Sequence, residues 1–356
     1  MKKTLMRLLT LIVPAALGAC STTEPPPSQA MAEAPTPQLA SSVGAAPLRL
    51  VQTIPLLGVE GRFDHFAIDL NRQYLFIAAL GNDTLEVLDL RNRKRLRSIR
   101  GLQKPTGIAF APEFSRIFAA SGDSGKCDIF EASSGSRDAL RLVQSVTSLP
   151  DADNVQYDSA AKRVYVGYGD GAIGIVNAQN GQHLGDIKLA GHPESFQLEK
   201  AGARLFVNVP TAGHIAVVDR NQRTVIATWP LQSARSNFPM ALDEAHHRLF
   251  VGCRDPARVL VYDTASGRVT TTLKIAGDTD DLFYDVALKR LYVACGAGFI
   301  NVFQQQNADL YTPIASIGTA VGARTALFVP ELKRLYLAVP HRGIQGAQIR
   351  VYTVQP

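Results

Sequence analysis

The chain has 356 residues, of which 46% are hydrophobic and 19% are charged, and its formal net charge is +6 at pH 7. Three of the positive charges and no acidic residue lie in the first twenty residues, so the rest of the chain carries about +3. No cluster of Lys and Arg interleaved with aromatic residues occurs in that remainder, which argues against a nucleic-acid partner.

Residues 1–20 are typical of an export signal rather than of a folded element. A basic start is followed by an apolar stretch at 8–16, which is too short to span a bilayer. The segment Leu17-Gly18-Ala19-Cys20 then resembles the lipobox of bacterial lipoproteins, which implies that Cys20 carries lipid, including palmitate. The alternative is an ordinary signal peptide cleaved before Cys20. Because Ser21 and not Asp follows, we expect an outer-membrane lipid anchor on the periplasmic side of the cell envelope.

Residues 21–47 are rich in Pro, Ala and Ser and contain few large apolar side chains. Such a segment cannot bury enough surface to fold, so it is expected to be a disordered tether. Residues 48–356 repeat one pattern throughout and are expected to form a single domain.

The repeat consists of an apolar run, an acidic turn and a second apolar strand that usually begins with Arg. This second strand recurs seven times, as YLFIAA (74–79), RIFAAS (116–121), RVYVGY (163–168), RLFVNV (204–209), RLFVGC (248–253), RLYVAC (290–295) and RLYLAV (334–339). A period in the low forties, built from short β-type runs, is typical of the blades of a β-propeller. The sequence therefore predicts an all-β fold with seven blades of four antiparallel strands.

The fifth repeat shows the four strands best, at 239–243, 248–253, 258–263 and 268–275. The last repeat contains only three strands before the chain ends. Residues 49–57 precede the first repeat and resemble the fourth strands of the other repeats. We therefore expect this N-terminal strand to complete the seventh blade, which closes the ring and leaves no open sheet edge.

These repeats resemble the YVTN-type, or YncE-like, family of extracytoplasmic β-propellers. The segments 81–118 and 214–231 carry the resemblance best, and it extends over essentially all of 48–356. The chain has no literal YVTN, and its turns read APEFS, DEAHH or PELK in place of the usual Ser-Pro-Asp-Gly. The resemblance implies a stable disc that presents loops for binding, and it implies no particular reaction.

Three cysteines remain in the repeats, Cys127, Cys253 and Cys295. Cys253 and Cys295 occupy the same position in neighbouring blades, where they are expected to lie beyond the roughly 7 Å between Cα atoms that a disulfide tolerates. We expect all three to be buried small apolar residues. No CxxCH or CxxC motif indicates haem or zinc.

The loops that lead into the first strand of each blade are expected to meet at one mouth of the central channel. The candidate ligand-binding residues at this mouth are Arg62, Asp64, His65, Asp153, Asn154, Glu194, Arg235, Asn237, Asp280, Asp281, Arg324 and His341. Three interpretations of this polar set remain open: a ring of ion pairs, an anion or peptide site and a metal site.

In the first interpretation the groups neutralise one another, with Arg235 between Glu194 and Asp280 and with Arg324 on the other side of Asp280. In the second, four arginines bind an anionic ligand or a peptide: Arg62, Arg235, Arg254 and Arg324.

In the third, oxygen ligands from five blades bind Ca²⁺ or Mg²⁺: Asp64, Asn154, Glu194, Asn237 and Asp281. Such an ion could polarise a lactone or ester carbonyl, with Asp280 or His65 accepting a proton. Zinc is not expected, because His65 has no HxH or HxxxH partner. A serine nucleophile at Ser195 is not expected either, because the chain has no GxSxG and only His192 lies near it in sequence.

We therefore expect a membrane-anchored periplasmic β-propeller that binds a small molecule or a protein through its loop face. The alternative is a metal-assisted lactonase or related hydrolase at the channel mouth. Unpaired carboxylates with pKa values shifted toward neutrality would favour the enzyme, and satisfied ion pairs would favour the binding module.

Overall fold

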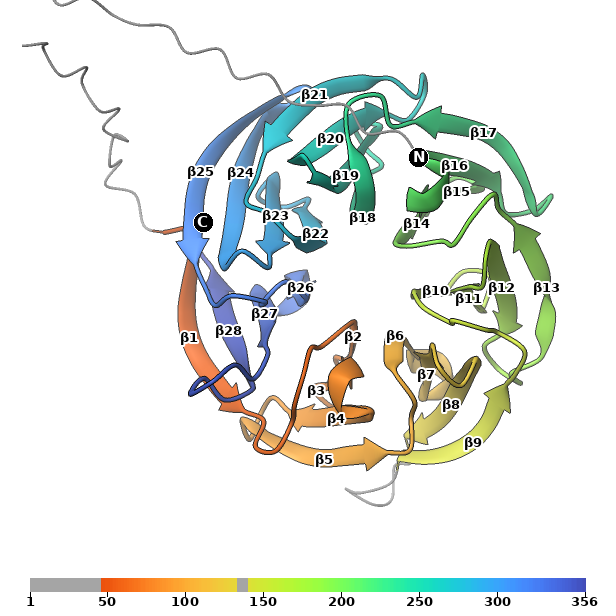
Figure 1. Cartoon of the computed structure of the whole chain (residues 1–356), viewed down its shortest axis with the longest axis vertical. Coiled ribbons are helices and arrows are strands. Elements are labelled where there is room, and N and C mark those ends of the chain that lie inside the picture. Colours follow the sequence, from red (N-terminus) through yellow and green to blue (C-terminus); the bar gives the residue numbers. More distant parts are fainter. Residues whose placement is uncertain (1–45, 133–139) are drawn as a thin grey trace, which may run out of the picture. The chain divides into compact units, whose positions relative to one another are not determined.

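A computed structural model describes residues 46–132 and 140–356. The expected signal segment, the expected lipidation site Cys20 and nearly all of the expected tether lie outside the described residues. The described part of the chain belongs to one compact unit. It is a ring of seven four-stranded antiparallel sheets around a central channel (Figure 1), as the repeats predict.

Each blade runs from an inner strand beside the channel to an outer strand at the rim (Figure 1). Blades one to three contain β2 (Phe66–Asp69), β3 (Tyr74–Ala79), β4 (Thr84–Asp89) and β5 (Lys94–Arg100); β6 (Pro105–Ala111), β7 (Arg116–Ser121), β8 (Lys126–Ala132) and β9 (Leu140–Val146); and β10 (Val155–Asp158), β11 (Arg163–Tyr168), β12 (Ala172–Asn177) and β13 (His183–Lys188). Blades four and five contain β14 (Phe196–Leu198), β15 (Arg204–Val209), β16 (His214–Asp219) and β17 (Thr224–Pro230); and β18 (Arg235–Asp243), β19 (Arg248–Asp255), β20 (Ala257–Asp263) and β21 (Val269–Lys274).

Blade six consists of four consecutive strands, and blade seven joins the two ends of the described chain. These blades contain β22 (Thr279–Asp285), β23 (Arg290–Cys295), β24 (Phe299–Asn307) and β25 (Leu310–Gly318); and β26 (Ala326–Val329), β27 (Arg334–Val339) and β28 (Gln348–Val354). The fourth strand of blade seven is β1 (Leu48–Pro55), which pairs antiparallel with β28 from Leu48↔Val354 to Pro55↔Gln348. The predicted closure by the N-terminal strand is confirmed.

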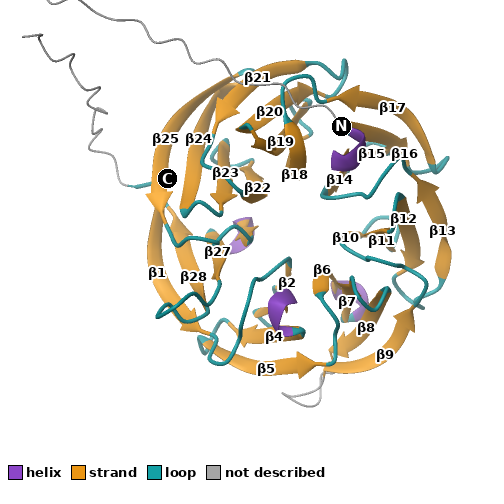
Figure 2. Ribbon diagram, viewed as in Figure 1, coloured by secondary structure: helices purple, strands orange, loops and turns teal. Residues whose placement is uncertain are grey.

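The helical content of the described residues is limited to short 3₁₀ turns between strands (Figure 2). They are η1 (Leu80–Asn82), η2 (Pro112–Phe114), η3 (Pro210–Ala212) and η4 (Pro330–Leu332). Within the described ranges, no helix has the length and apolarity needed to cross a membrane.

The apolar core lies between the blades rather than at the centre of the ring. Seven clusters of buried side chains each combine residues of two neighbouring blades, and one of them joins blade seven to blade one. The aromatic residue in the middle of each second strand is buried in these interfaces: Phe76, Phe118, Tyr165, Phe206, Phe250, Tyr292 and Tyr336. The repeated aromatic residue in the sequence therefore marks the surface that holds neighbouring blades together.

Cys127, Cys253 and Cys295 are buried free thiols, as expected. Burial raises the pKa of all three, to about 12 for Cys253 and Cys295. Their thiols are therefore protonated at neutral pH, and they belong to the packing of the blades rather than to a reactive site.

Candidate functional site

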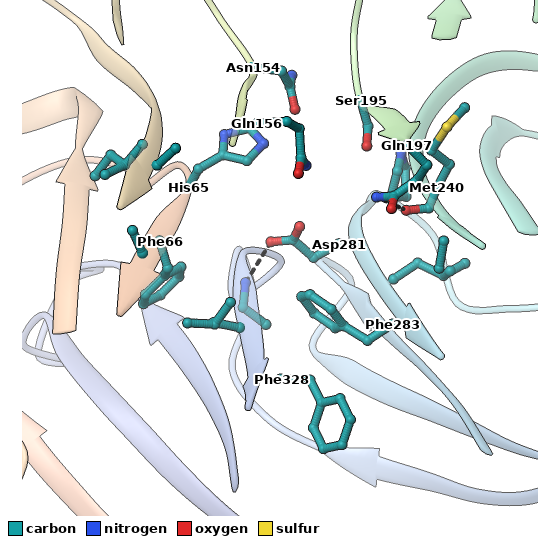
Figure 3. Close-up of a pocket in the computed structure, with 18 of the residues that line it drawn as sticks. His65, Phe66, Asn154, Gln156, Ser195, Gln197, Met240, Asp281, Phe283 and Phe328 are labelled. Carbon is teal, nitrogen blue, oxygen red and sulfur yellow. Dashed lines mark hydrogen bonds between the residues drawn. The ribbon is translucent and has the colours of Figure 1, made fainter. Parts of the chain in front are cut away.

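The inner strands of the blades surround a cavity of about 520 Å³ in the central channel. His65, Asn154, Ser195 and Asp281 point into it from different blades (Figure 3). A second cavity of about 100 Å³ shares the first three of these residues, and we call it the channel mouth. It is lined by Arg62, Asp64, His65, Asp153, Asn154, Glu194, Ser195, Phe238, Arg254, Asp280 and Arg324. The mouth is therefore almost entirely polar and continuous with the channel.

Most of the residues that the sequence places at the mouth do line it. Eight of the twelve candidates line the mouth cavity, namely Arg62, Asp64, His65, Asp153, Asn154, Glu194, Asp280 and Arg324. Asp281 lines the channel instead.

The other three candidates lie outside both cavities. Arg235 is 80% exposed and forms an ion pair with Asp255 at 2.8 Å, so the expectation that it lies between Glu194 and Asp280 is wrong. Asn237 is fully buried and donates from Nδ2 to Asn208 Oδ1 at 2.8 Å. His341 contacts Glu60 and lines a neighbouring cavity of about 220 Å³.

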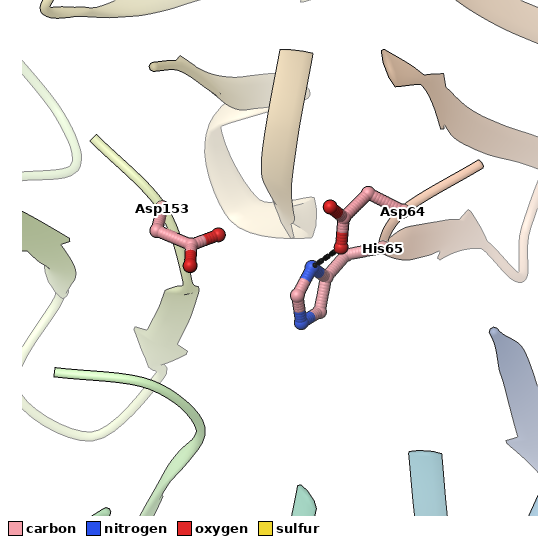
Figure 4. Close-up of side chains that lie close together, drawn as sticks. All are labelled: Asp64, His65 and Asp153. Carbon is pink, nitrogen blue, oxygen red and sulfur yellow. Dashed lines mark ion pairs between the residues drawn. The ribbon is translucent and has the colours of Figure 1, made fainter. Parts of the chain in front are cut away.

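Asp64 and His65 form a tight pair on the loop that leads into β2. The imidazole Nδ1 lies 2.7 Å from Asp64 Oδ1 (Figure 4). Burial lowers the pKa of His65, but the charge and hydrogen bond of Asp64 outweigh burial and hold that pKa well above its usual value. Burial likewise opposes ionisation of Asp64, but His65 and nearby arginines keep its pKa below the usual value. The pair is therefore an imidazolium and a carboxylate at neutral pH.

Arg254 and Arg324 hold Asp280 between them on the side of the mouth formed by blades five to seven. Arg324 Nε lies 2.8 Å from Asp280 Oδ2, and Arg324 also pairs with Asp278 at 2.6 Å. Arg254 donates to Asp280 and stacks over the Phe238 ring, with its guanidinium carbon 3.8 Å from the ring centroid. This side of the mouth contains the satisfied ion pairs that the neutralising interpretation predicts.

The opposite side of the mouth is not neutralised in this way. His192 Nε2 lies 3.6 Å from Asp153 Oδ2, and the interaction with the Asp153 carboxylate is the main cause that raises the pKa of His192 to about 9. Burial, together with the nearby Asp153 charge, raises the pKa of Glu194 to about 8. At neutral pH this side therefore retains a protonated carboxyl group.

Asp281 is a second carboxyl group with a strongly shifted pKa, and it faces the channel (Figure 3). Its Oδ2 accepts a hydrogen bond from the backbone N–H of Ala326 at 2.7 Å. Burial raises the pKa of Asp281 to about 8, although the His65 charge and the Ala326 hydrogen bond oppose the shift. Asp281 is therefore predominantly protonated at pH 7 and can donate a proton to a group in the channel.

The five oxygen ligands expected for Ca²⁺ or Mg²⁺ do not line one cavity, because Asn237 lies outside both cavities and Asp281 lines the channel rather than the mouth. Among the described residues, two other sets have ligand atoms within 4.8 Å of one another, Asp64–His65–Asp153 and Asp153–His192–Glu194. Each contains an imidazole, so their donor chemistry favours a transition metal over the hard cations.

Sequence reasoning did not identify the contact between His192 and Asp153, because these residues belong to the entry loops of different blades. It also did not identify Phe238, whose aromatic ring stacks against the guanidinium group of Arg254. The signal for the first contact was present, since both loops precede inner strands and so end at the same mouth.

The fold and the mouth together define the class of this protein, a seven-bladed β-propeller with a charged cavity at one end of its channel. Hydrazine synthase from Kuenenia stuttgartiensis is similar in structure, with a TM-score of 0.69 and 14% identity over 80% of this chain and 95% of that chain. A chain of a mitotic checkpoint complex is also similar, with a TM-score of 0.73 and 10% identity over 98% of this chain and 100% of that chain. At these identities the likeness concerns the fold alone. No family model and no curated protein matches the chain.

Proposed function

We propose that this protein is a lipid-anchored periplasmic binding module, and that its channel mouth binds a small ligand with an anionic group. The observation that carries the proposal is the polar cavity of about 100 Å³, which opens into the channel and is lined by three arginines. Its size fits a small molecule or a single side chain of a protein partner better than an extended peptide.

Arg62 is the arginine best suited to receive the ligand. Its side chain is 52% exposed and its ion pair with Asp64 is long, at 3.6 Å, whereas Arg254 and Arg324 are held by Asp280. An incoming anion can therefore bind Arg62 without breaking a short contact. A charge-assisted hydrogen bond of this kind contributes about 1.5–3 kcal/mol, which is roughly a tenfold effect or more on affinity.

The test is a thermal-shift and calorimetry screen of the purified protein against acetate, succinate and gluconate, with glycerol as a neutral control. We expect at least one carboxylate to bind, and Arg62→Ala to weaken its binding about tenfold. Arg235→Ala is the matched control, because Arg235 is another exposed arginine with one carboxylate partner outside the mouth. Equal binding by both variants would contradict the role of the mouth, and binding of no carboxylate would direct the search to protein partners.

The envelope location has its own test. Replacing Cys20 by Ala is expected to abolish incorporation of labelled palmitate and to move the protein out of the outer-membrane fraction, because the thiol is the acylated atom of a lipobox. Cys127→Ala is the control, since this thiol is buried in a blade. An unchanged membrane fraction in the Cys20→Ala variant would contradict the anchor.

A second candidate function is hydrolysis of a lactone or ester assisted by a bound metal ion. Glu194 and Asp281 favour it, because both carboxyl groups have a pKa near 8 beside a concave cavity. The test is turnover of δ-gluconolactone or p-nitrophenyl acetate with and without an added metal ion. Turnover that requires the metal ion and is lost in Glu194→Gln would favour this candidate over the binding module.

A further inference from the structure

Three side chains on one side of the channel mouth converge from two neighbouring blades. Asp153 lies on the loop that leads into β10, and His192 and Glu194 lie on the loop that leads into β14. One ligand atom from each lies within 4.8 Å of the other two. Both loops are fixed to the second strands of their own blades, since Asp153 N–H donates to Gly167 O at 2.8 Å and Glu194 N–H donates to Asn208 O at 2.9 Å. The group is therefore held by the sheet rather than by free loops.

The imidazole of His192 is oriented for coordination. Its Nδ1 lies 2.8 Å from the carbonyl oxygen of Gly169. Because a carbonyl only accepts, Nδ1 donates to it, and Nε2, whose proton a bound cation would displace, faces Asp153 Oδ2 at 3.6 Å. Histidines that bind metals are usually oriented in this way, with the second ring nitrogen donating to a backbone carbonyl or a carboxylate.

The carboxyl group of Glu194 has no hydrogen bond or ion pair with any other described residue, although it lines the cavity and is partly buried. The two carboxylates next to it in the mouth differ in this respect, because Asp64 pairs with His65 and Asp280 pairs with Arg324. Partial burial of a carboxyl group without a partner is unfavourable, and a cation at this point would satisfy it.

We propose that Asp153, His192 and Glu194 form a binding site for a first-row transition-metal dication, with Zn²⁺ as the preferred ion. A tetrahedral ion with bonds of about 2.1 Å separates its ligand atoms by about 3.4 Å. The separation of 3.6 Å between His192 Nε2 and Asp153 Oδ2 is already close to that value. Three protein ligands leave a fourth position for water or for a ligand entering through the mouth.

The inference deepens the second candidate function, because it identifies the residues that would hold the metal ion, and it rests on the mouth being the functional site. It also differs from the oxygen-only set expected from the sequence. One imidazole and two carboxylates favour Zn²⁺ over Ca²⁺ and Mg²⁺. The competing explanation is that protonated His192 serves as the counter-ion of the two carboxyl groups and that no metal binds.

The experiment is isothermal titration of the chelator-treated purified protein with ZnCl₂, followed by CaCl₂ and MgCl₂ in separate runs. We expect one Zn²⁺ per chain and at least about 100-fold weaker binding of Ca²⁺ and Mg²⁺. His192→Ala and Glu194→Gln are each expected to weaken Zn²⁺ binding by at least about tenfold. Glu194→Gln keeps the shape of the side chain, so it remains informative if His192→Ala does not fold.

His183→Ala is the matched control, because His183 also contacts a carboxylate, Asp186 at 2.9 Å, but lies on β13 at the rim of blade three. Its Zn²⁺ affinity should equal that of the unaltered protein. Absence of Zn²⁺ binding, or unchanged binding in both mouth variants, would overturn the metal site and leave His192 as a counter-ion. Because the readout is metal binding alone, it is independent of carboxylate binding at Arg62 and of hydrolysis, so either proposed function can fail without the metal site failing.

Discussion

A chain that begins at Gly58 is expected to lose the cooperative unfolding transition of the propeller. The missing segment contains β1, which provides the fourth strand of blade seven and pairs with β28 from Leu48↔Val354 to Pro55↔Gln348. The same segment buries Leu48, Ile54 and Leu56 almost completely. Loss of one such side chain costs about 2–5 kcal/mol, so loss of all three is comparable to the entire stability of about 5–15 kcal/mol expected for a domain.

The measurement is a circular-dichroism melt of residues 58–356 beside residues 46–356, with limited proteolysis of both. A pair of point variants separates strand pairing from core packing. Ile54→Ala should cost about 2–4 kcal/mol because Ile54 is 1% exposed, whereas Leu50→Ala should cost under about 1 kcal/mol because Leu50 is 47% exposed on the same strand. A cooperative melt of the shorter chain at the temperature of the longer one would contradict closure by β1.

The sequence predicts this architecture well because the blades repeat one pattern of buried and exposed positions. Six of the seven second strands have the bounds read from the sequence, and only β19 is longer, because it continues to Asp255. The aromatic position in these strands is buried in every blade, since each blade must pack against the next. A signal repeated seven times therefore specifies both the number of blades and the faces that meet.

The positions of individual polar side chains are less predictable, and Arg235 shows the reason. The sequence places the first strand of blade five at 239–243, which leaves Arg235 on a loop at the mouth. The strand actually begins at Arg235, and its register sets Arg235 opposite Asp255 at the extended end of β19. A strand only four residues longer thus moves the guanidinium from the mouth into an exposed ion pair.

Side-chain contacts between neighbouring blades could not be predicted from the sequence either. His192 and Asp153 are 39 positions apart on the entry loops of neighbouring blades, and their contact depends on the Gly169 carbonyl that orients the imidazole. That carbonyl belongs to a turn of blade three. A repeat therefore predicts which loops share an end of the channel, and it does not predict which side chains within them meet.

Replacing Asp281 by Asn is expected to stabilise the protein at pH 8 and to have little effect at pH 5. The carboxyl pKa is about 8 in the folded protein against a reference value of 3.8, so the folded state binds the extra proton between these values. Stability therefore decreases as pH rises through this window, and the loss is complete above the folded pKa. The amide cannot ionise, and its oxygen can still accept the Ala326 N–H.

The expected gain in free energy of unfolding at pH 8 is on the order of 2 kcal/mol. This is smaller than the full pKa shift would give, because the side chain faces the channel. Thermal melts of both proteins at pH 5 and pH 8 measure this gain. Taking the difference between their free energies of unfolding largely removes the contribution of His65 titration, which the Asp281 charge also influences. Asp255→Asn is the control, because this exposed carboxylate pairs with Arg235 and should show the same small change at both pH values. If the difference in free energy of unfolding between the Asp281→Asn variant and the unaltered protein stays constant with pH, Asp281 is ionised throughout. The channel would then hold a fixed negative charge next to His65, which would favour bound cations over the proton-donating role assigned to Asp281.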